Sequence, residues 1–232
     1  MITSQISSTP LPALLIFIKW PVPGEVKTRL TPPLTGEEAA LLCRFMILDT
    51  LKATEMVQGV SRILCHAGDE AHSAVFRDMT AGIPMERQQG NDLGERLETA
   101  FAAAFADGRQ AVAVIGSDAP HLPPAQISEA LKILTDDASD VVFVPSADGG
   151  YCLLAMKRLH CELFREIPWS SGDVLDVSLT RATAAGLRTT LLQPCFDLDT
   201  VDDLRRLASH PDRAAAPLTR EFLRHLDLRP DR

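Results

Sequence analysis

The feature that most constrains the fold is the alternation of short apolar runs with longer stretches of helical periodicity. Residues 13–18 read ALLIFI, residues 111–115 read AVAVI, and residues 141–144 read VVFV. Runs of this length without a polar face indicate strands that are buried on both sides. The stretches between them are long enough to hold helices, which is typical of βαβ units. We therefore expect an α/β fold with a mainly parallel sheet and helices on both faces.

The other expected elements continue this alternation. Thr35 followed by Glu38 is the pattern of a capping box, and it predicts a helix that runs to about Thr54. Further strands are expected at residues 62–65, near Met85, at 151–155 and at 189–192, and further helices at 71–78, 93–105, 124–134, 174–185, 201–209 and after 211. We expect one domain over residues 13–210, a flexible N-terminal tail at 1–12 and a C-terminal helix or tail at 211–232.

Composition argues against several classes of protein. The formal net charge is −8, whereas a protein that binds a nucleic-acid backbone needs a basic surface. The apolar run near the N-terminus ends at Lys19, far short of the roughly 20 residues that span a bilayer. The five cysteines include no CxxC pair and mostly lie in apolar runs, which favours buried thiols in a reducing cytosol over disulfides or zinc. We expect a soluble, cytoplasmic protein.

The loop after the first expected strand is the first candidate site, because ligands of open parallel sheets bind at the carboxyl ends of strands. It reads KWPVPGEVKTRL and carries Lys19, Lys27 and Arg29 in a chain that is acidic overall. Two prolines stiffen the loop, and Gly24 allows a ligand to approach the backbone. These features favour a diphosphate site, although a solvated loop with locally paired cations is the alternative. Neither the P-loop spacing nor a GxGxxG fingerprint is present.

Aspartates form the second candidate site. Ser117 and Asp118 follow the strand at 111–115, where a carboxylate suits Mg²⁺ or Mn²⁺, cations that take oxygen ligands and bridge phosphate oxygens. The alternative for Asp118 is a turn former. Asp197 and Asp199 alternate in an extended segment, so at least one of them can point to the same metal.

Three further segments carry weaker signals. Thr200 and Asp203 resemble a capping box and need no other role. Asp148 is followed by two glycines and a tyrosine, which fits close approach to a bulky ligand or a simple turn. In the segment QGNDLGER at residues 89–96, a helix cap is the favoured interpretation, but Gly90, Asp92 and Arg96 are candidate nucleotide contacts.

Taken in order, these segments resemble the bacterial family called domain of unknown function 2064 (DUF2064). Its members are described as nucleotide-diphospho-sugar transferases of the GT-A fold, including the arsenosugar biosynthesis glycosyltransferase group. The resemblance runs from about residue 14 to 207 and rests on residues 19–30, 89–96, 116–120, 148–151, 167–171 and 197–200. Family members often have Cys at the position of Ala119 and Thr at that of Ser171, and neither difference removes a charge.

The resemblance implies a Rossmann-like GT-A sheet with the nucleotide bound at the loop after the first strand. It also implies that Asp118 is the counterpart of a DxD-type metal aspartate. Related nucleotidylyltransferases use a similar sheet, with a second aspartate in a segment like residues 197–200. The two reactions differ in whether the bond to the sugar carbon or the bond to the α-phosphorus breaks.

The favoured hypothesis is a metal-dependent glycosyltransferase with a nucleotide-diphosphate sugar and a small-molecule acceptor as substrates. Asp148 or Asp173 is the candidate general base for the acceptor hydroxyl. Two alternatives stay open: a nucleotidylyltransferase, although its Gly-rich LxGGxSxRxG-type loop is absent, and a non-catalytic nucleotide-sugar binding module. The candidate substrate contacts are Lys19, Gly24, Lys27, Arg29, Gly90, Asp92, Arg96 and Ser117, and the candidate ligands of Mg²⁺ or Mn²⁺ are Asp118, Asp197 and Asp199.

Overall fold

Seven strands form one sheet in the computed structural model, which describes residues 10–68, 77–80 and 82–226. Its order is β3-β2-β1-β4-β6-β5-β7, and all neighbours are parallel except β6, which runs antiparallel between β4 and β5. The strands are β1 (Ala13–Lys19), β2 (Ser61–Ala67), β3 (Met85–Arg87), β4 (Val112–Gly116), β5 (Val141–Pro145), β6 (Tyr151–Met156) and β7 (Thr189–Leu191). The expected α/β fold with a mainly parallel sheet is confirmed.

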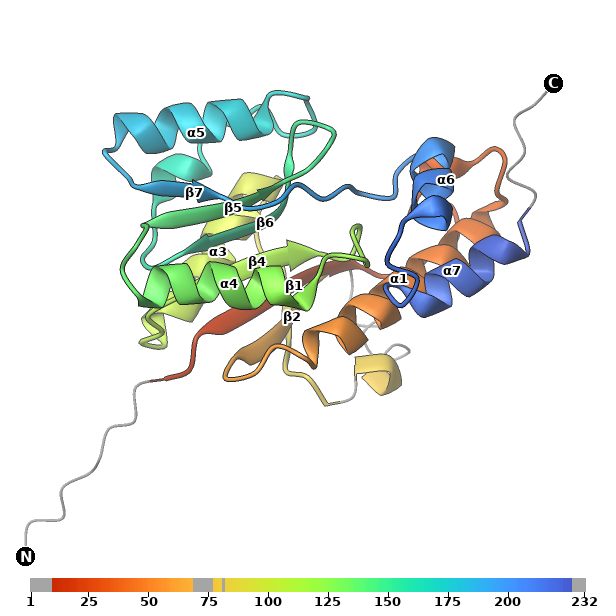
Figure 1. The fold of residues 1–232 in the computed structure, drawn as a ribbon, viewed down its shortest axis with the longest axis horizontal. Helices are drawn as coiled ribbons and strands as arrows, with labels where there is room; N and C mark the ends of the chain where they lie inside the picture. Colours follow the sequence, from red (N-terminus) through yellow and green to blue (C-terminus); the bar gives the residue numbers. More distant parts are fainter. Residues whose placement is uncertain (1–9, 69–76, 81, 227–232) are drawn as a thin grey trace, which may run out of the picture.

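Helices cover both faces of this sheet (Figure 1). They are α1 (Gly36–Thr54), α3 (Leu93–Ala106), α4 (Pro124–Thr135), α5 (Val174–Ala184), α6 (Val201–Ser209) and α7 (Pro217–Arg224), with short 3-10 turns η1 (Thr28–Leu30), η2 (Arg77–Thr80) and η3 (Cys161–Leu163). Most of the helix expected at 71–78 lies outside the described residues, and its last two positions belong to η2. No helix in the described part of the chain is both long and apolar enough to cross a membrane.

The central strands bury side chains on both faces, which explains their uninterrupted apolar sequences. In β1, Leu14 and Ile16 pack into the cluster under α1 and α4, whereas Leu15 packs into the cluster under α3 and α5. All three side chains are at most 1% exposed. A polar side chain on either face of such a strand would lose its hydrogen bonds to water on burial. This free-energy cost explains why the strand lacks the alternating polar and apolar pattern of a half-exposed sheet.

A short hairpin fixes the direction of β6 and places one candidate site residue. Only residues 146–150 connect β5 to β6, and a parallel crossover needs a dozen or more residues. The strand must therefore turn back, and the turn that holds Asp148 lies at the carboxyl end of β5. This is the same edge of the sheet at which β1 and β4 end.

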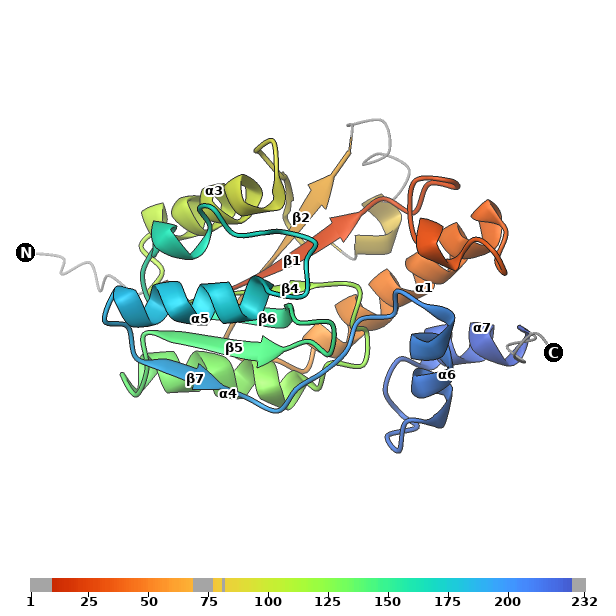
Figure 2. The same cartoon turned by 90° about the horizontal axis from the view of Figure 1, so that it is seen from above.

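The C-terminal helices pack on α1 and form a third apolar cluster. Seen from above, α6 and α7 lie beside α1, beyond the carboxyl ends of β1 and β5 (Figure 2). Asp49 of α1 is 3% exposed, and its carboxylate accepts hydrogen bonds from the backbone N–H groups of Leu218 (3.1 Å) and Thr219 (2.8 Å) at the start of α7. These contacts lead us to propose that α7 belongs to the same domain as the sheet.

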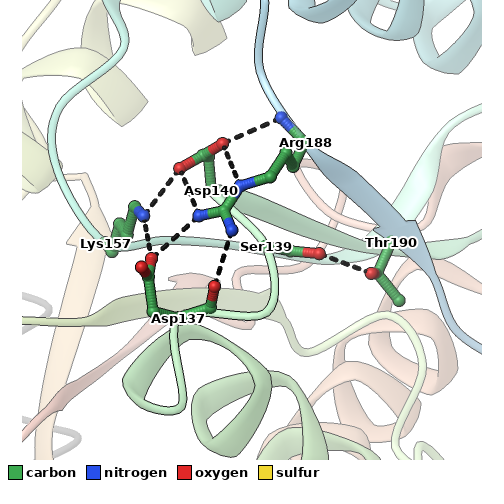
Figure 3. A network of polar contacts seen from close by, with 6 residues as sticks. All are labelled: Asp137, Ser139, Asp140, Lys157, Arg188 and Thr190. Carbon is green, nitrogen blue, oxygen red and sulfur yellow. Dashed lines mark hydrogen bonds and ion pairs between the residues drawn. The ribbon is translucent and has the colours of Figure 1, made fainter.

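An ion-pair network lies at the amino ends of β5 and β7, on the side of the sheet opposite to the turn that holds Asp148 (Figure 3). Asp140 lies before β5, and its carboxylate accepts from the backbone N–H of Arg188 (2.8 Å) and from Arg188 Nε (3.1 Å). The Nζ of Lys157, which follows β6, lies 2.7 Å from the other oxygen of Asp140. Asp137 also pairs with both cations. The network therefore ties the ends of β5, β6 and β7 to one another.

Replacing Asp140 with asparagine removes the negative charge that Arg188 and Lys157 share. The Asp140 side chain is only 12% exposed, so we expect the free energy of unfolding at neutral pH to fall by about 1–2 kcal/mol. Urea denaturation of the wild type and Asp140→Asn measures this loss. Glu55→Gln, which breaks an exposed pair with Lys52, is the matched control and should leave stability nearly unchanged.

The pH dependence of this loss follows from the pKa of Asp140. Hydrogen bonds from Arg188, with help from Lys157, outweigh partial burial and hold that pKa well below its ordinary value. Because the folded pKa lies below the unfolded value of about 3.9, the stabilisation is complete above that pH and disappears as the pH falls through the folded pKa. The difference between wild type and Asp140→Asn should therefore shrink in strong acid. A difference that stays constant from neutral pH to strong acid contradicts this account.

Candidate active site

A cleft of about 710 Å³ opens at the carboxyl edge of the sheet, where β1 and β4 end and β6 begins. Its walls carry charges of both signs. The lining cations are Lys19, Lys27, Arg29 and Arg96, and the lining aspartates are Asp118, Asp148, Asp197 and Asp199. Ser117 also lines the cleft. Segments that lie far apart in the sequence thus meet here, as expected for the carboxyl ends of parallel strands.

Lys27 is the central cation of this cleft. Its Nζ lies 2.7 Å from Asp118 Oδ1 and 2.8 Å from Asp199 Oδ1, and its side chain is only 6% exposed. Burial alone would lower the pKa of the Lys27 ammonium, but the charges of Asp118 and Asp199 outweigh it and hold that pKa above its ordinary value. Arg29 is 73% exposed, and its Nη1 stands 4.0 Å from Asp199 Oδ2. The buried ammonium of Lys27 therefore joins the loop after β1, the end of β4 and the segment before α6.

The extended segment before α6 is held along the edge of the sheet by backbone hydrogen bonds. Cys195 N donates to Pro145 O (2.9 Å), and Leu198 N donates to Asp118 O (2.8 Å). With Leu198 fixed in this way, Asp197 and Asp199 both line the cleft. The capping box expected just after them is confirmed, because Thr200 and Asp203 exchange the two hydrogen bonds that define it.

Asp197 differs from its neighbours in its protonation. Its oxygens accept from Ser146 Oγ (2.9 Å) and Cys152 Sγ (3.7 Å). Burial, together with the negative charges of Asp118, Asp148 and Asp199, raises the pKa of Asp197 to about 7. Asp118 shows the opposite behaviour. Desolvation of its carboxylate also disfavours the charged form, but the positive charges of Lys27 and Lys19 outweigh desolvation and lower the pKa of Asp118. Asp118 is thus ionised at neutral pH, whereas Asp197 is partly protonated.

The aspartates do not form a three-ligand cage. In the described residues, no group of three or more His, Cys, Asp or Glu side chains is arranged to hold a metal ion. Asp118 and Asp199 keep 52% and 37% of their side chains exposed to the cleft, and both bind the same ammonium. Two carboxylates that already share a cation are oxygen donors of the kind that Mg²⁺ uses together with phosphate oxygens and water.

Four of the expected contacts are absent from the lining of the cleft. Asp92 caps α3, because its Oδ1 accepts from Glu95 N (2.8 Å). Asp173 is the exposed residue before α5, outside the cleft. Gly24 and Gly90 have φ angles of 80° and 140°, which few other residues adopt, so their role in the described structure is to shape loops.

Of the two glycines after Asp148, Gly149 packs on a neighbouring loop, whereas Gly150 lines the cleft. Gly149 has a φ of 89°, and a Cβ added to it would lie 1.9 Å from the carbonyl oxygen of Gly172. The sequence pattern fits close approach to a bulky ligand or a simple turn. The structure has a turn here, closed by a hydrogen bond from Gly149 N to Ser146 O (3.2 Å), and Gly149 approaches the loop before α5. This contact brings that loop over the cleft, where Trp169 and Gly172 line one wall.

Gln88 and Trp169 line the cleft although no sequence pattern assigned them a role. Gln88 Nε2 donates to the carbonyl oxygens of Ile18 (3.2 Å) and Cys65 (2.8 Å), so it joins the ends of β1 and β2. Trp169 packs so closely on the first turn of α3 that a Cβ at Gly94 would lie 2.6 Å from its Nε1. The signals for this contact were a glycine in the first turn of a predicted helix, where alanine is otherwise preferred, and the place of Trp169 in the segment 167–171 that carries the family resemblance.

Comparisons with known proteins find a matching family and several similar proteins. The model of a family described as uncharacterized proteins conserved in bacteria (DUF2064) matches residues 50–171. A protein from Desulfovibrio desulfuricans, described only provisionally as a nucleotide-diphospho-sugar transferase, is 31% identical and has a TM-score of 0.84, over 92% of this chain and 94% of that one. The phosphoenolpyruvate guanylyltransferase of Rubrobacter xylanophilus is 28% identical over 153 residues, which are 64% of this chain and 71% of that protein.

A more distant structure shares the fold alone. It is a manganese complex of a Mycobacterium tuberculosis protein, with a TM-score of 0.51 and 20% identity over 86% of this chain and 98% of that one. The names of the two nearer relatives are those of transferases with nucleotide-linked substrates, and this supports a transferase here. The chain belongs to the DUF2064 family and has the α/β fold of nucleotide-diphospho-sugar transferases.

Proposed function

We propose that this protein is a metal-dependent glycosyltransferase that moves a sugar from a nucleotide-diphosphate donor to a small-molecule acceptor. The observation that carries the proposal is the ammonium group of Lys27, which is held between Asp118 and Asp199 at the carboxyl ends of β1 and β4. Cations for a diphosphate and oxygen ligands for a metal thus meet at one point of the cleft. The likeness to the Desulfovibrio desulfuricans protein, which extends over 92% of this chain, supports the same reaction class.

The side chains divide into two sets by charge. Lys19, Lys27 and Arg29 bind the diphosphate, and Arg29 is the most accessible of the basic residues paired with the aspartates. Asp118 and Asp199 would hold Mg²⁺ or Mn²⁺ through their carboxylate oxygens. When bound, the metal supplies positive charge that neutralises the leaving diphosphate.

Sugar transfer requires one bond to break and one to form. The bond between the sugar carbon and the diphosphate oxygen breaks, and its electron pair stays on the diphosphate. The acceptor oxygen forms the new bond to the sugar carbon and loses its proton to a carboxylate. Asp148 lines the cleft and Asp173 does not, so Asp148 is the stronger of the two candidate bases.

Nucleotidyl transfer is the second candidate, and the relative from Rubrobacter xylanophilus favours it. In that reaction an acceptor phosphate attacks the α-phosphorus of a nucleoside triphosphate, and pyrophosphate leaves. The same cations and carboxylates would serve, since both reactions place negative charge on a phosphate chain. Against nucleotidyl transfer, the loop from Lys19 to Leu30 contains Pro21 and Pro23 and is not the glycine-rich loop typical of nucleotidylyltransferases.

Asp118→Asn tests the metal-binding role at constant side-chain size. We expect isothermal titration to show at least about tenfold weaker Mn²⁺-dependent binding of nucleotide sugars, because a neutral amide is a poor ligand for a hard cation. Asp136→Asn, which changes an exposed aspartate after α4, is the control and should bind like the wild type. Undiminished binding by a folded Asp118→Asn variant contradicts the assignment.

The leaving group separates the two reactions. The purified protein is supplied with nucleotide sugars or with nucleoside triphosphates, with Mn²⁺ and a panel of hydroxyl and phosphate acceptors, and the products are identified by chromatography. We expect a free nucleoside diphosphate to appear with the glycosylated acceptor. Pyrophosphate released from a triphosphate would instead select nucleotidyl transfer. Tight metal-dependent binding without either product would indicate a binding module.

A further inference from the structure

We propose that Lys27 and the divalent cation compete for the same pair of carboxylates, so that metal and phosphate chain bind cooperatively. The inference rests on the proposed function, because it concerns the metal and the diphosphate of that site. Phosphate oxygens attract the Lys27 ammonium away from Asp118 and Asp199, and this movement frees the two carboxylates for the metal. Lys27 thereby makes metal binding depend on the nucleotide.

The geometry of the ammonium supports this competition. Lys27 Nζ bonds to one oxygen of each carboxylate, at 2.7 and 2.8 Å. A Mg²⁺ ion bound to the same two oxygens would lie at about 2.1 Å from each, in the space between them that the ammonium fills. The two cations cannot both occupy the space between these oxygens. The absence of a three-ligand group in the described residues agrees with a metal that takes its remaining ligands from the substrate.

The backbone around Lys27 allows the side chain to move while the loop stays in place. Lys27 itself has a φ of 49° and precedes η1. Its carbonyl accepts from Leu30 N at 2.9 Å, and the Leu30 side chain is fully buried. The loop is therefore anchored just after Lys27, and rotations within the lysine side chain can carry its charge along the cleft.

The charges around Lys27 give the competition its direction. A buried ammonium loses a large electrostatic stabilisation when it leaves two carboxylates without gaining another anion. A metal ion alone offers Lys27 no such anion, whereas a metal with a diphosphate does. Arg29 is exposed and can bind the phosphates before Lys27 moves. By linkage, the factor by which the diphosphate tightens metal binding equals the factor by which metal tightens diphosphate binding.

The direct test measures the binding of Mn²⁺ alone, by the loss of its free electron paramagnetic resonance signal. Lys27→Met removes the ammonium but keeps an unbranched side chain, and we expect it to bind Mn²⁺ at least about tenfold more tightly than the wild type. Lys27→Arg keeps the charge and should bind as weakly as the wild type. Lys132→Met removes an exposed lysine of α4 and is the matched control for net charge. Equal or weaker Mn²⁺ binding by Lys27→Met overturns the inference.

Two further measurements keep the result interpretable. If Lys27→Met is unstable, a larger rise in its melting temperature on adding Mn²⁺ than in that of the wild type reports the same gain, because only native protein binds the ion. The double variant Lys27→Met with Asp118→Asn should lose the gain, and a gain that persists places the ion elsewhere and overturns the inference. If the wild type transfers sugar but Lys27→Met does not bind Mn²⁺ more tightly, the inference is refuted and the proposed function stands. If Lys27→Met binds Mn²⁺ more tightly but the wild type transfers no sugar, the inference stands and the proposed function is refuted.

Discussion

The cleft depends on the ion pairs of the buried Lys27 ammonium with Asp118 and Asp199. A lysine with 6% of its side chain exposed persists there because two carboxylates balance its charge. Each partner comes from a different part of the chain, so the ion joins the loop after β1, the end of β4 and the segment that leads into α6. A site with this arrangement brings cations and oxygen donors to the same point, which is what a metal-bound phosphate chain requires.

The fold was largely predictable from the sequence because its main determinants are local. Buried strands such as β4 show as apolar runs, and the start of α1 shows as a capping box. The place of β6 was not predictable in the same way, since strand order is decided by pairing between distant segments. The packing of α7 on α1 depends on Asp49, a carboxylate that gives no signal in a helical sequence pattern.

The candidate site was predictable in part, for a physical reason. Polar residues after strands converge at the carboxyl edge of a parallel sheet, and this placed Asp118 near the loop after β1. The sequence could not show that Lys27 lies between the aspartates or that Asp197 bonds to Ser146, because side-chain partners depend on geometry. The close contact of Gly149 with Gly172 was likewise hidden, since a glycine pair fits a ligand, a turn or a neighbouring loop equally well.

The central claim is that a phosphate chain and a divalent metal meet at Asp118 and Asp199, with Lys27 on the phosphates. A crystal structure with Mn²⁺ and a nucleoside diphosphate, in which anomalous scattering locates the metal, tests this claim most directly. The account predicts an anomalous peak between the two carboxylates and the Lys27 ammonium on a phosphate oxygen. A metal bound elsewhere, or Lys27 still between the aspartates with both ligands present, would contradict it.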